Sequence, residues 1–95
     1  MDQIEQKVTQ LVRNIILGAG TFTQLDGLSR NTDLFAQGYL DSLLMVSLIL
    51  SMEKEFAIQI PLDKITNENI SSIDSIIVLV NQLAEKQHAH EMTVA

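Results

Sequence analysis

Aliphatic residues recur every three or four positions in three stretches of this 95-residue chain, at about residues 3–17, 42–56 and 72–86. That spacing places them along one side of an α-helix and predicts three main helices. Gly18 follows the first stretch directly, where a glycine commonly ends a helix. Residues 58–60 alternate apolar and polar, but no other segment has the character of a strand that could pair with them. The pattern therefore predicts an all-α bundle.

A long connection separates the first two predicted helices. Residues 18–41 are rich in Gly, Ser, Asn and Asp and show no sustained period, so we expect a loop. Loops of this length in compact domains are usually functional or anchored to the core. The expected anchors are Phe22, Leu25, Leu28, Leu34 and Phe35.

Shorter elements are expected after Pro61. Residues 62–70 predict a short, poorly formed fourth helix, anchored by three aliphatic side chains. These anchors are Leu62, Ile65 and Ile70. Residues 71–74 read Ser-Ser-Ile-Asp, a relative of the capping box in which Asp74 replaces glutamate, so the last helix should begin there. No period continues beyond residue 87, and we expect residues 88–95 to be a flexible tail.

Composition excludes several classes of function. A formal net charge of −6, with only 6 Lys and Arg residues, argues against a nucleic-acid partner. The absence of cysteine excludes disulfides, thiolate metal sites and a thiol nucleophile, and it fits a reducing compartment. The first residues lack the order of a signal peptide, and the longest apolar run, residues 43–52, is far shorter than the ~20 residues of a membrane span. We expect a single-domain cytoplasmic protein without a transmembrane segment.

A polar loop meets a strongly apolar stretch at Asp41 and Ser42. Both residues are good helix N-caps, so the second helix should begin at or beside Ser42. A phosphate attached to a hydroxyl at that place would lie beside unpaired N–H groups and the positive end of the helix dipole. Ser42 is therefore a candidate phosphoester site, although a simple cap is the commoner explanation of such a pair on local sequence alone.

The second predicted helix is apolar on more than one side. A domain of this size cannot easily bury every such side chain, and surplus apolar surface usually marks a binding face. We expect a partner-docking surface formed by Leu43, Leu44, Ser47 and Leu50.

A hydrolase would need Ser42 as nucleophile, His88 or His90 as base and Asp41 as the group that orients the base. Both histidines fall in the predicted tail, whereas a catalytic base must be held rigidly. The same two imidazoles, without further preorganised ligands, make a poor metal site. We therefore predict no catalytic residue and no metal site.

Two runs of sequence, residues 33–43 and 53–61, resemble those of acyl and peptidyl carrier proteins, and the resemblance extends over residues 4–84. It rests on Asp-Leu-Phe, Gly-Tyr-Leu-Asp-Ser-Leu and Phe-Ala-Ile-Gln-Ile-Pro. It implies a carrier-like bundle in which Ser42 carries covalent 4′-phosphopantetheine from coenzyme A, with Asp41 in a supporting role. The fatty-acid type has acidic residues where this chain has Leu44 and Ser47, so the chain looks more like discrete aminoacyl, peptidyl or D-alanyl carriers.

The resemblance implies a non-enzymatic carrier domain over residues 1–87, a monomer that holds an acyl, aminoacyl or peptidyl intermediate as a thioester. It implies polyketide or nonribosomal-peptide biosynthesis as the setting. Its implied partners are a phosphopantetheinyl transferase, a loading ligase, adenylation enzyme or acyltransferase, and a downstream synthase or transferase. The alternative is a helical interaction module or homodimer that uses residues 42–56.

Overall fold

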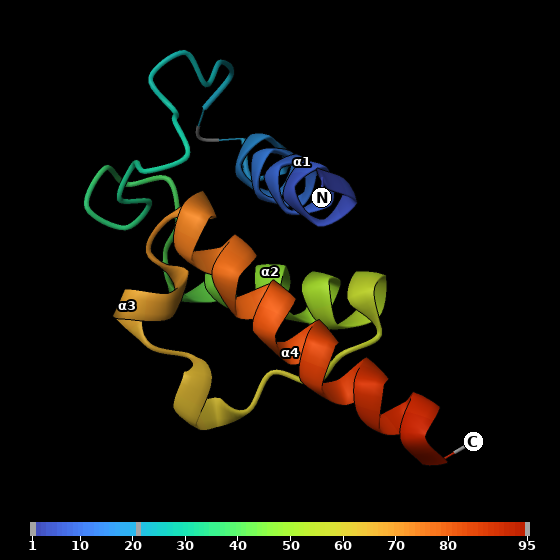
Figure 1. Cartoon of the computed structure of the whole chain (residues 1–95). Helices are drawn as coiled ribbons and strands as arrows, with labels where there is room; N and C mark the ends of the chain where they lie inside the picture. Colours follow the sequence, from blue (N-terminus) through green and yellow to red (C-terminus); the bar gives the residue numbers. More distant parts are fainter. Residues whose placement is uncertain (1, 21, 95) are drawn as a thin grey trace.

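The computed structural model describes residues 2–20 and 22–94, with Asp2 and residues 89–94 described only by their place in a helix. Within these residues every regular element is helical, which confirms the predicted all-α fold (Figure 1). The elements are α1 (Asp2–Gly18), α2 (Ser42–Phe56), the 3₁₀ turn η1 (Leu62–Lys64), α3 (Asn67–Ile70) and α4 (Ile73–Val94). None of the described helices is both long enough and apolar enough to cross a membrane.

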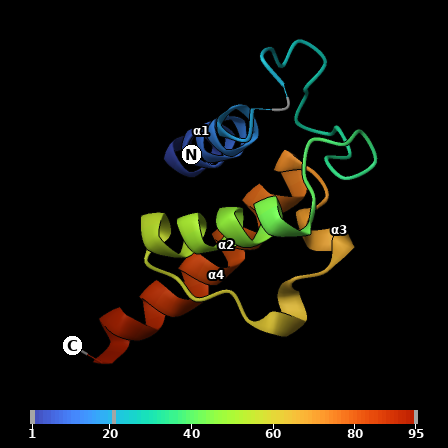
Figure 2. The same cartoon turned by 180° about the vertical axis from the view of Figure 1, so that it is seen from behind.

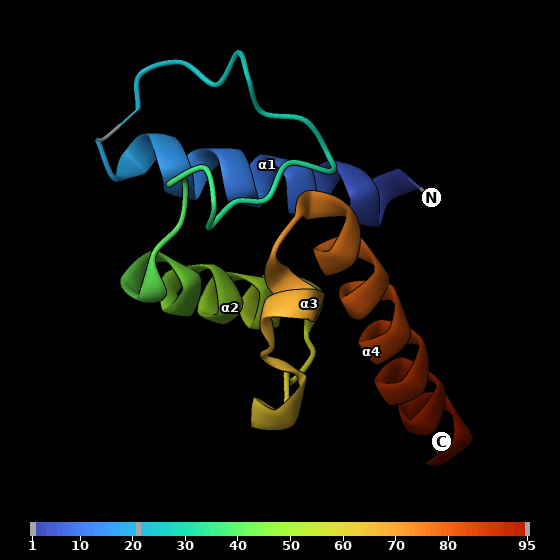
Figure 3. The ribbon, with the colours of Figure 1, turned by 90° about the vertical axis from the view of Figure 1, so that its left-hand side faces the viewer.

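Three long helices surround the core. α1 packs against both α2 and α4, and α3 packs on α4. Figure 1 shows α4 in front of α2, and Figure 2 shows α2 in front of α4, so these two helices face opposite sides of the molecule. In Figure 3, α1 lies across the pair, and the long loop returns along it before entering α2.

The predicted side of α1 faces this core. Val8, Val12 and Ile16 are buried four residues apart, as an amphipathic helix requires. Each aliphatic side chain removed from water contributes about 1.5–3 kcal/mol. The helix ends at Gly18, and Gly20 then takes a positive φ of 83° that favours glycine.

The C-terminal end of α2 is held by backbone and carboxylate contacts. Ala57 adopts the left-handed conformation, with φ 54° and ψ 48°, and its N–H donates to the Glu53 carbonyl. The Glu53 carboxylate accepts from the Ile60 N–H at 2.8 Å. Ile58 and Ile60 are both buried, so residues 58–60 form an extended segment tied to the helix end.

One expected anchor after Pro61 was wrong. Leu62 is 86% exposed, whereas Ile65 packs against the core and Ile70 is buried. The segment is also divided into two short elements, because the backbone leaves the helical region at Ile65, with ψ 77°, and restarts at Thr66, whose side chain caps α3.

The cap of α4 differs from the predicted one. Ser72, not Ser71, is the capping residue: its hydroxyl accepts from the Ser75 N–H, and the Ser75 hydroxyl accepts from the Ser72 N–H, both at 3.1 Å. The Asp74 carboxylate instead accepts from Arg30 Nε at 2.8 Å. The two reciprocal hydrogen bonds of the capping box therefore join Ser72 and Ser75, one residue later than predicted. Asp74 takes no part in them and bonds to the loop.

The predicted end of the last helix near residue 86 was wrong, because α4 continues to Val94. Gln87 bonds through its side-chain amide to both backbone groups of Gln59, at 2.9 and 2.8 Å, and His88 Nε2 lies 3.2 Å from the Ala57 carbonyl oxygen. These contacts hold α4 against the segment after α2. The flexibility expected of residues 88–95 stays a prediction, since the side chains of 89–94 and residue 95 are outside the described part.

Candidate functional site

The chain enters α2 through a tight turn that begins at Asp33. The Asp33 carboxylate accepts from the N–H groups of Phe35 and Ala36, at 3.1 and 3.0 Å. Gly38 then takes a positive φ of 80°, a conformation that favours glycine. The Asp-Leu-Phe and Gly-Tyr-Leu parts of the sequence pattern therefore build the turn itself.

Leu34 holds this turn in place. Its carbonyl accepts from the N–H groups of Tyr39 and Leu40, at 2.8 and 3.1 Å, and its own N–H donates to the Ser71 carbonyl at 2.7 Å. The Leu34 side chain is fully buried. The turn before α2 is thereby fixed to the segment that leads into α4, a link that the sequence pattern did not reveal.

Asp41 sets the first turn of α2. Leu40 is buried, and the next residue, Asp41, is extended, with φ −125° and ψ −174°. The Asp41 carboxylate accepts from the Leu44 N–H at 2.9 Å, and its carbonyl accepts from the Met45 N–H at 2.9 Å. This is an N-cap in the usual geometry. The predicted beginning of the helix at Ser42 is confirmed.

Ser42 is exposed at the first position of α2. Among the described residues, no acceptor is present for the N–H groups of Ser42 and Leu43, whereas those of Leu44 and Met45 bond to Asp41. A phosphoester on the Ser42 hydroxyl would therefore lie beside two open donors and the positive end of the helix dipole. The local chemistry fits a phosphate group.

The outward face of α2 lies next to Ser42. Leu43 is 75% exposed and Leu50 is 60% exposed, and Ser47 between them is also exposed. Leu44, expected on the same face, is only half-buried and packs partly against the core. Val46 was not among the residues expected on this face, yet it is 49% exposed. Helical register with Leu43 and Leu50 was the signal that could have placed it.

The two histidines are not brought to Ser42. His88 contacts Ala57, and fifteen residues of helical rise put that end of α2 about 22 Å from Ser42. The side chain of His90 lies outside the described part of the chain. Among the described side chains, no group of three or more His, Asp or Glu is arranged to hold a metal ion.

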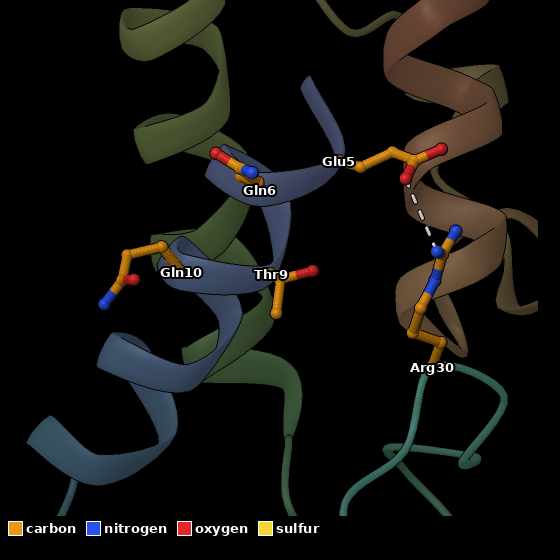
Figure 4. A pocket seen from close by; sticks show the side chains of 5 residues that line it. All are labelled: Glu5, Gln6, Thr9, Gln10 and Arg30. Carbon is orange, nitrogen blue, oxygen red and sulfur yellow. Dashed lines mark hydrogen bonds and ion pairs between the residues drawn. The ribbon is translucent and has the colours of Figure 1, made fainter. Parts of the chain in front are cut away.

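A pocket of about 410 Å³ lies on a different part of the surface. It is lined by Glu5, Gln6, Thr9, Gln10 and Arg30. Figure 4 shows Arg30 reaching from the loop toward Glu5 on α1, where the two side chains are 3.4 Å apart. Ser42 and the outward face of α2 do not contribute to it, so the pocket is separate from the candidate site.

The fold and the site define a small helical domain that presents one serine hydroxyl at the start of a helix. A family profile described as "Phosphopantetheine attachment site" matches residues 10–77. The chain belongs to this phosphopantetheine-binding carrier family, and its cofactor is covalently attached 4′-phosphopantetheine. Carrier domains of this family are served by phosphopantetheinyl transferases and work with synthase enzymes.

A solved structure has the same fold. A chain in a crystal described as "Crystal structure of FAD-dependent dehydrogenase" is 31% identical, with a TM-score of 0.66, over 78% of this chain and 99% of that chain. Those words concern the other crystal and assign no flavin chemistry to the present chain. The comparison with curated proteins gave no match.

Proposed function

We propose that this chain is a discrete carrier protein whose 4′-phosphopantetheine arm is attached to Ser42. The observation that carries the proposal is the exposed Ser42 hydroxyl in the first turn of α2, beside the open N–H groups of Ser42 and Leu43. The helix dipole and the unpaired N–H groups stabilise a phosphate most strongly at that N-terminal position. The arm supplies the thiol that a chain without cysteine lacks, and an acyl, aminoacyl or peptidyl group is held on it as a thioester.

Asp41 supports this function in two ways. Its carboxylate holds the Leu44 N–H and so fixes the first turn that presents Ser42. The same carboxylate is exposed, and it can therefore help the transferase to position its metal ion or the serine hydroxyl. The two roles are compatible, because a carboxylate has two oxygens and only one of them caps the helix.

The outward face of α2 is proposed as the docking surface for the enzymes that act on the arm. It consists of Leu43, Ser47 and Leu50, together with the half-buried Leu44 and the exposed Val46. We propose as partners a phosphopantetheinyl transferase, a loading ligase, adenylation enzyme or acyltransferase, and a downstream synthase or transferase of polyketide or nonribosomal-peptide type. The chain itself contributes no catalytic residue. A cytoplasmic location fits a protein that lacks cysteine and receives its arm from coenzyme A.

The test is covalent modification at one residue. Wild-type protein is incubated with coenzyme A, Mg²⁺ and a broad-specificity phosphopantetheinyl transferase, and intact mass is measured. We expect one arm per chain, none on Ser42→Ala, and a normal yield on the matched control Ser51→Ala, because Ser51 is a serine of the same helix that lies neither at its start nor in the proposed docking surface. An arm on the Ser42→Ala variant, or no arm on the wild type, would refute the proposal.

The exposed aliphatic side chains Leu43, Val46 and Leu50 also favour a second candidate, an interaction module or homodimer built on α2. Such a module would bury this surface without modification of Ser42. Sedimentation analysis of the unmodified protein separates the two functions, since a homodimer has twice the mass, whereas the carrier is expected to be a monomer.

A further inference from the structure

The outer part of the loop between α1 and α2, residues 22–32, is bonded mainly to itself, and we call it the strap (Figure 3). The Ser29 N–H donates to the Thr32 hydroxyl at 2.9 Å, and the Thr32 N–H donates to the Ser29 carbonyl at 3.2 Å. Among the described residues, every hydrogen bond that leaves the strap involves Arg30. Apart from its apolar side chains and its two ends, the strap is therefore fastened to the rest of the fold at one residue.

Arg30 joins the strap to two helices at once. Its carbonyl accepts from the Asp74 N–H at 2.9 Å, its Nε donates to the Asp74 carboxylate at 2.8 Å, and its Nη1 lies 3.4 Å from the Glu5 carboxylate (Figure 4). The Asp74 N–H lies in the first turn of α4, where no acceptor exists within the helix, so the strap supplies the acceptor. The three side chains are about half exposed, and exposed ion pairs contribute little to stability. These contacts, the Arg30 clasp, are therefore a weak fastening.

The strap also buries little apolar surface. Leu25 is 6% exposed, but Phe22 and Leu28 are only partly buried. Phe22 packs against Tyr39, with ring centroids 4.7 Å apart, and Tyr39 belongs to the turn that leads to Ser42. The long helices, by contrast, each bury a whole row of aliphatic side chains. Opening of the strap should therefore cost less free energy than unfolding of the bundle.

The turn before Ser42 has an anchor of its own. Leu34 follows the strap by two residues, and its side chain is fully buried. Its N–H donates to the Ser71 carbonyl, and its carbonyl accepts from the N–H groups of Tyr39 and Leu40. None of these hydrogen bonds involves a residue of the strap, so the turn can keep its place when the strap moves.

We propose that the strap opens as a unit while the three long helices and the turn before Ser42 stay folded, and that the Arg30 clasp sets how often it opens. Opening uncovers Leu25 and the side of the Tyr39 ring that faces Phe22. The clasp thereby controls how much apolar surface the protein shows beside the turn that presents Ser42. Strap opening does not require that Ser42 be modified.

The experiment is amide hydrogen exchange, followed by NMR on the unmodified full chain at several low urea concentrations. The Asp74 N–H reports strap opening, because its acceptor is the Arg30 carbonyl. The Leu34 N–H reports the turn, and the N–H of Val80, buried in α4, reports the bundle. After correction for intrinsic rates, we expect Asp74 to exchange faster than Leu34 and Val80. Its rate should also depend less on urea, because a local opening exposes less surface than global unfolding.

Three variants test the clasp. Arg30→Ala removes the guanidinium but keeps the carbonyl, and it should speed exchange at Asp74 by about threefold to tenfold. Glu5→Gln weakens only the longer contact and should speed that exchange less than about twofold. Arg13→Ala is the matched control, since Arg13 is an exposed arginine of α1 with no hydrogen bond to the strap, and it should leave the rate unchanged.

Three results would overturn the proposal. If Asp74 exchanges at the rate and with the urea dependence of Val80, the strap opens only when the bundle unfolds. If Leu34 exchanges together with Asp74, the turn before Ser42 opens with the strap. If Arg30→Ala leaves Asp74 exchange unchanged, the clasp does not fasten the strap. A wild-type chain that accepts no arm would refute the carrier function alone, because exchange is measured without the arm.

Discussion

Replacement of Asp41 by alanine removes the side-chain cap of α2. The lost contact is the 2.9 Å hydrogen bond from the Leu44 N–H to the Asp41 carboxylate. Loss of an Asp, Asn or Ser cap costs roughly 0.5–2 kcal/mol. Asp41 is exposed, so water can partly satisfy the freed Leu44 N–H, and we expect a loss of about 1 kcal/mol in the free energy of unfolding. For a domain of this size that corresponds to a Tm lower by about 4–8 °C.

The asparagine variant separates the cap from the charge. Asparagine caps a helix about as well as aspartate, so Asp41→Asn should stay within about 0.5 kcal/mol of the wild type. If the carboxylate also assists the transferase, Asp41→Asn should be modified more slowly than the wild type despite its normal stability.

Urea unfolding followed by circular dichroism gives the stability of both Asp41 variants, and intact mass gives the rate of arm attachment. An Asp41→Ala variant that unfolds at the wild-type midpoint would show that Asp41 does not fix the first turn, and the structural reason for the exposed Ser42 would be wrong. If the arm is attached to Asp41→Asn at the wild-type rate, the only role left for Asp41 is to cap α2.

Two further substitutions test the segment after α2. Ala57→Gly should stabilise the protein by about 0.5–1 kcal/mol, because Ala57 has a φ of 54° where glycine is less strained, and a higher urea midpoint would show it. Gln87→Ala should cost about 1–2 kcal/mol through its two hydrogen bonds to the Gln59 backbone, whereas Gln82→Ala, an exposed glutamine of the same helix, should cost less than about 0.5 kcal/mol. Equal midpoints for the two glutamine variants would mean that Gln87 does not hold α4 in place.

Local sequence was sufficient for α1, for α2 and for the position of Ser42 at the start of α2. The repeat that identifies α1 and the cap at Asp41 depend on contacts within four residues, so one chain shows them directly. The same holds for the turn after Asp33, whose carboxylate reaches only two and three residues ahead. The resemblance of residues 33–43 and 53–61 to carrier proteins indicated the class before any tertiary contact was known, and the family match supports that class.

Contacts between distant residues decided the rest. α2 is apolar on most sides, so its spacing alone could not tell that Leu48 is buried while Val46 and Leu50 are exposed. That choice depends on where α1 and α4 pack against it. In the same way, α4 passes its predicted end because Gln87 bonds to Gln59, 28 residues away, a pairing that no local period encodes. The docking face that we propose depends on the same packing, because Leu43, Val46 and Leu50 stay exposed in the described part of the fold.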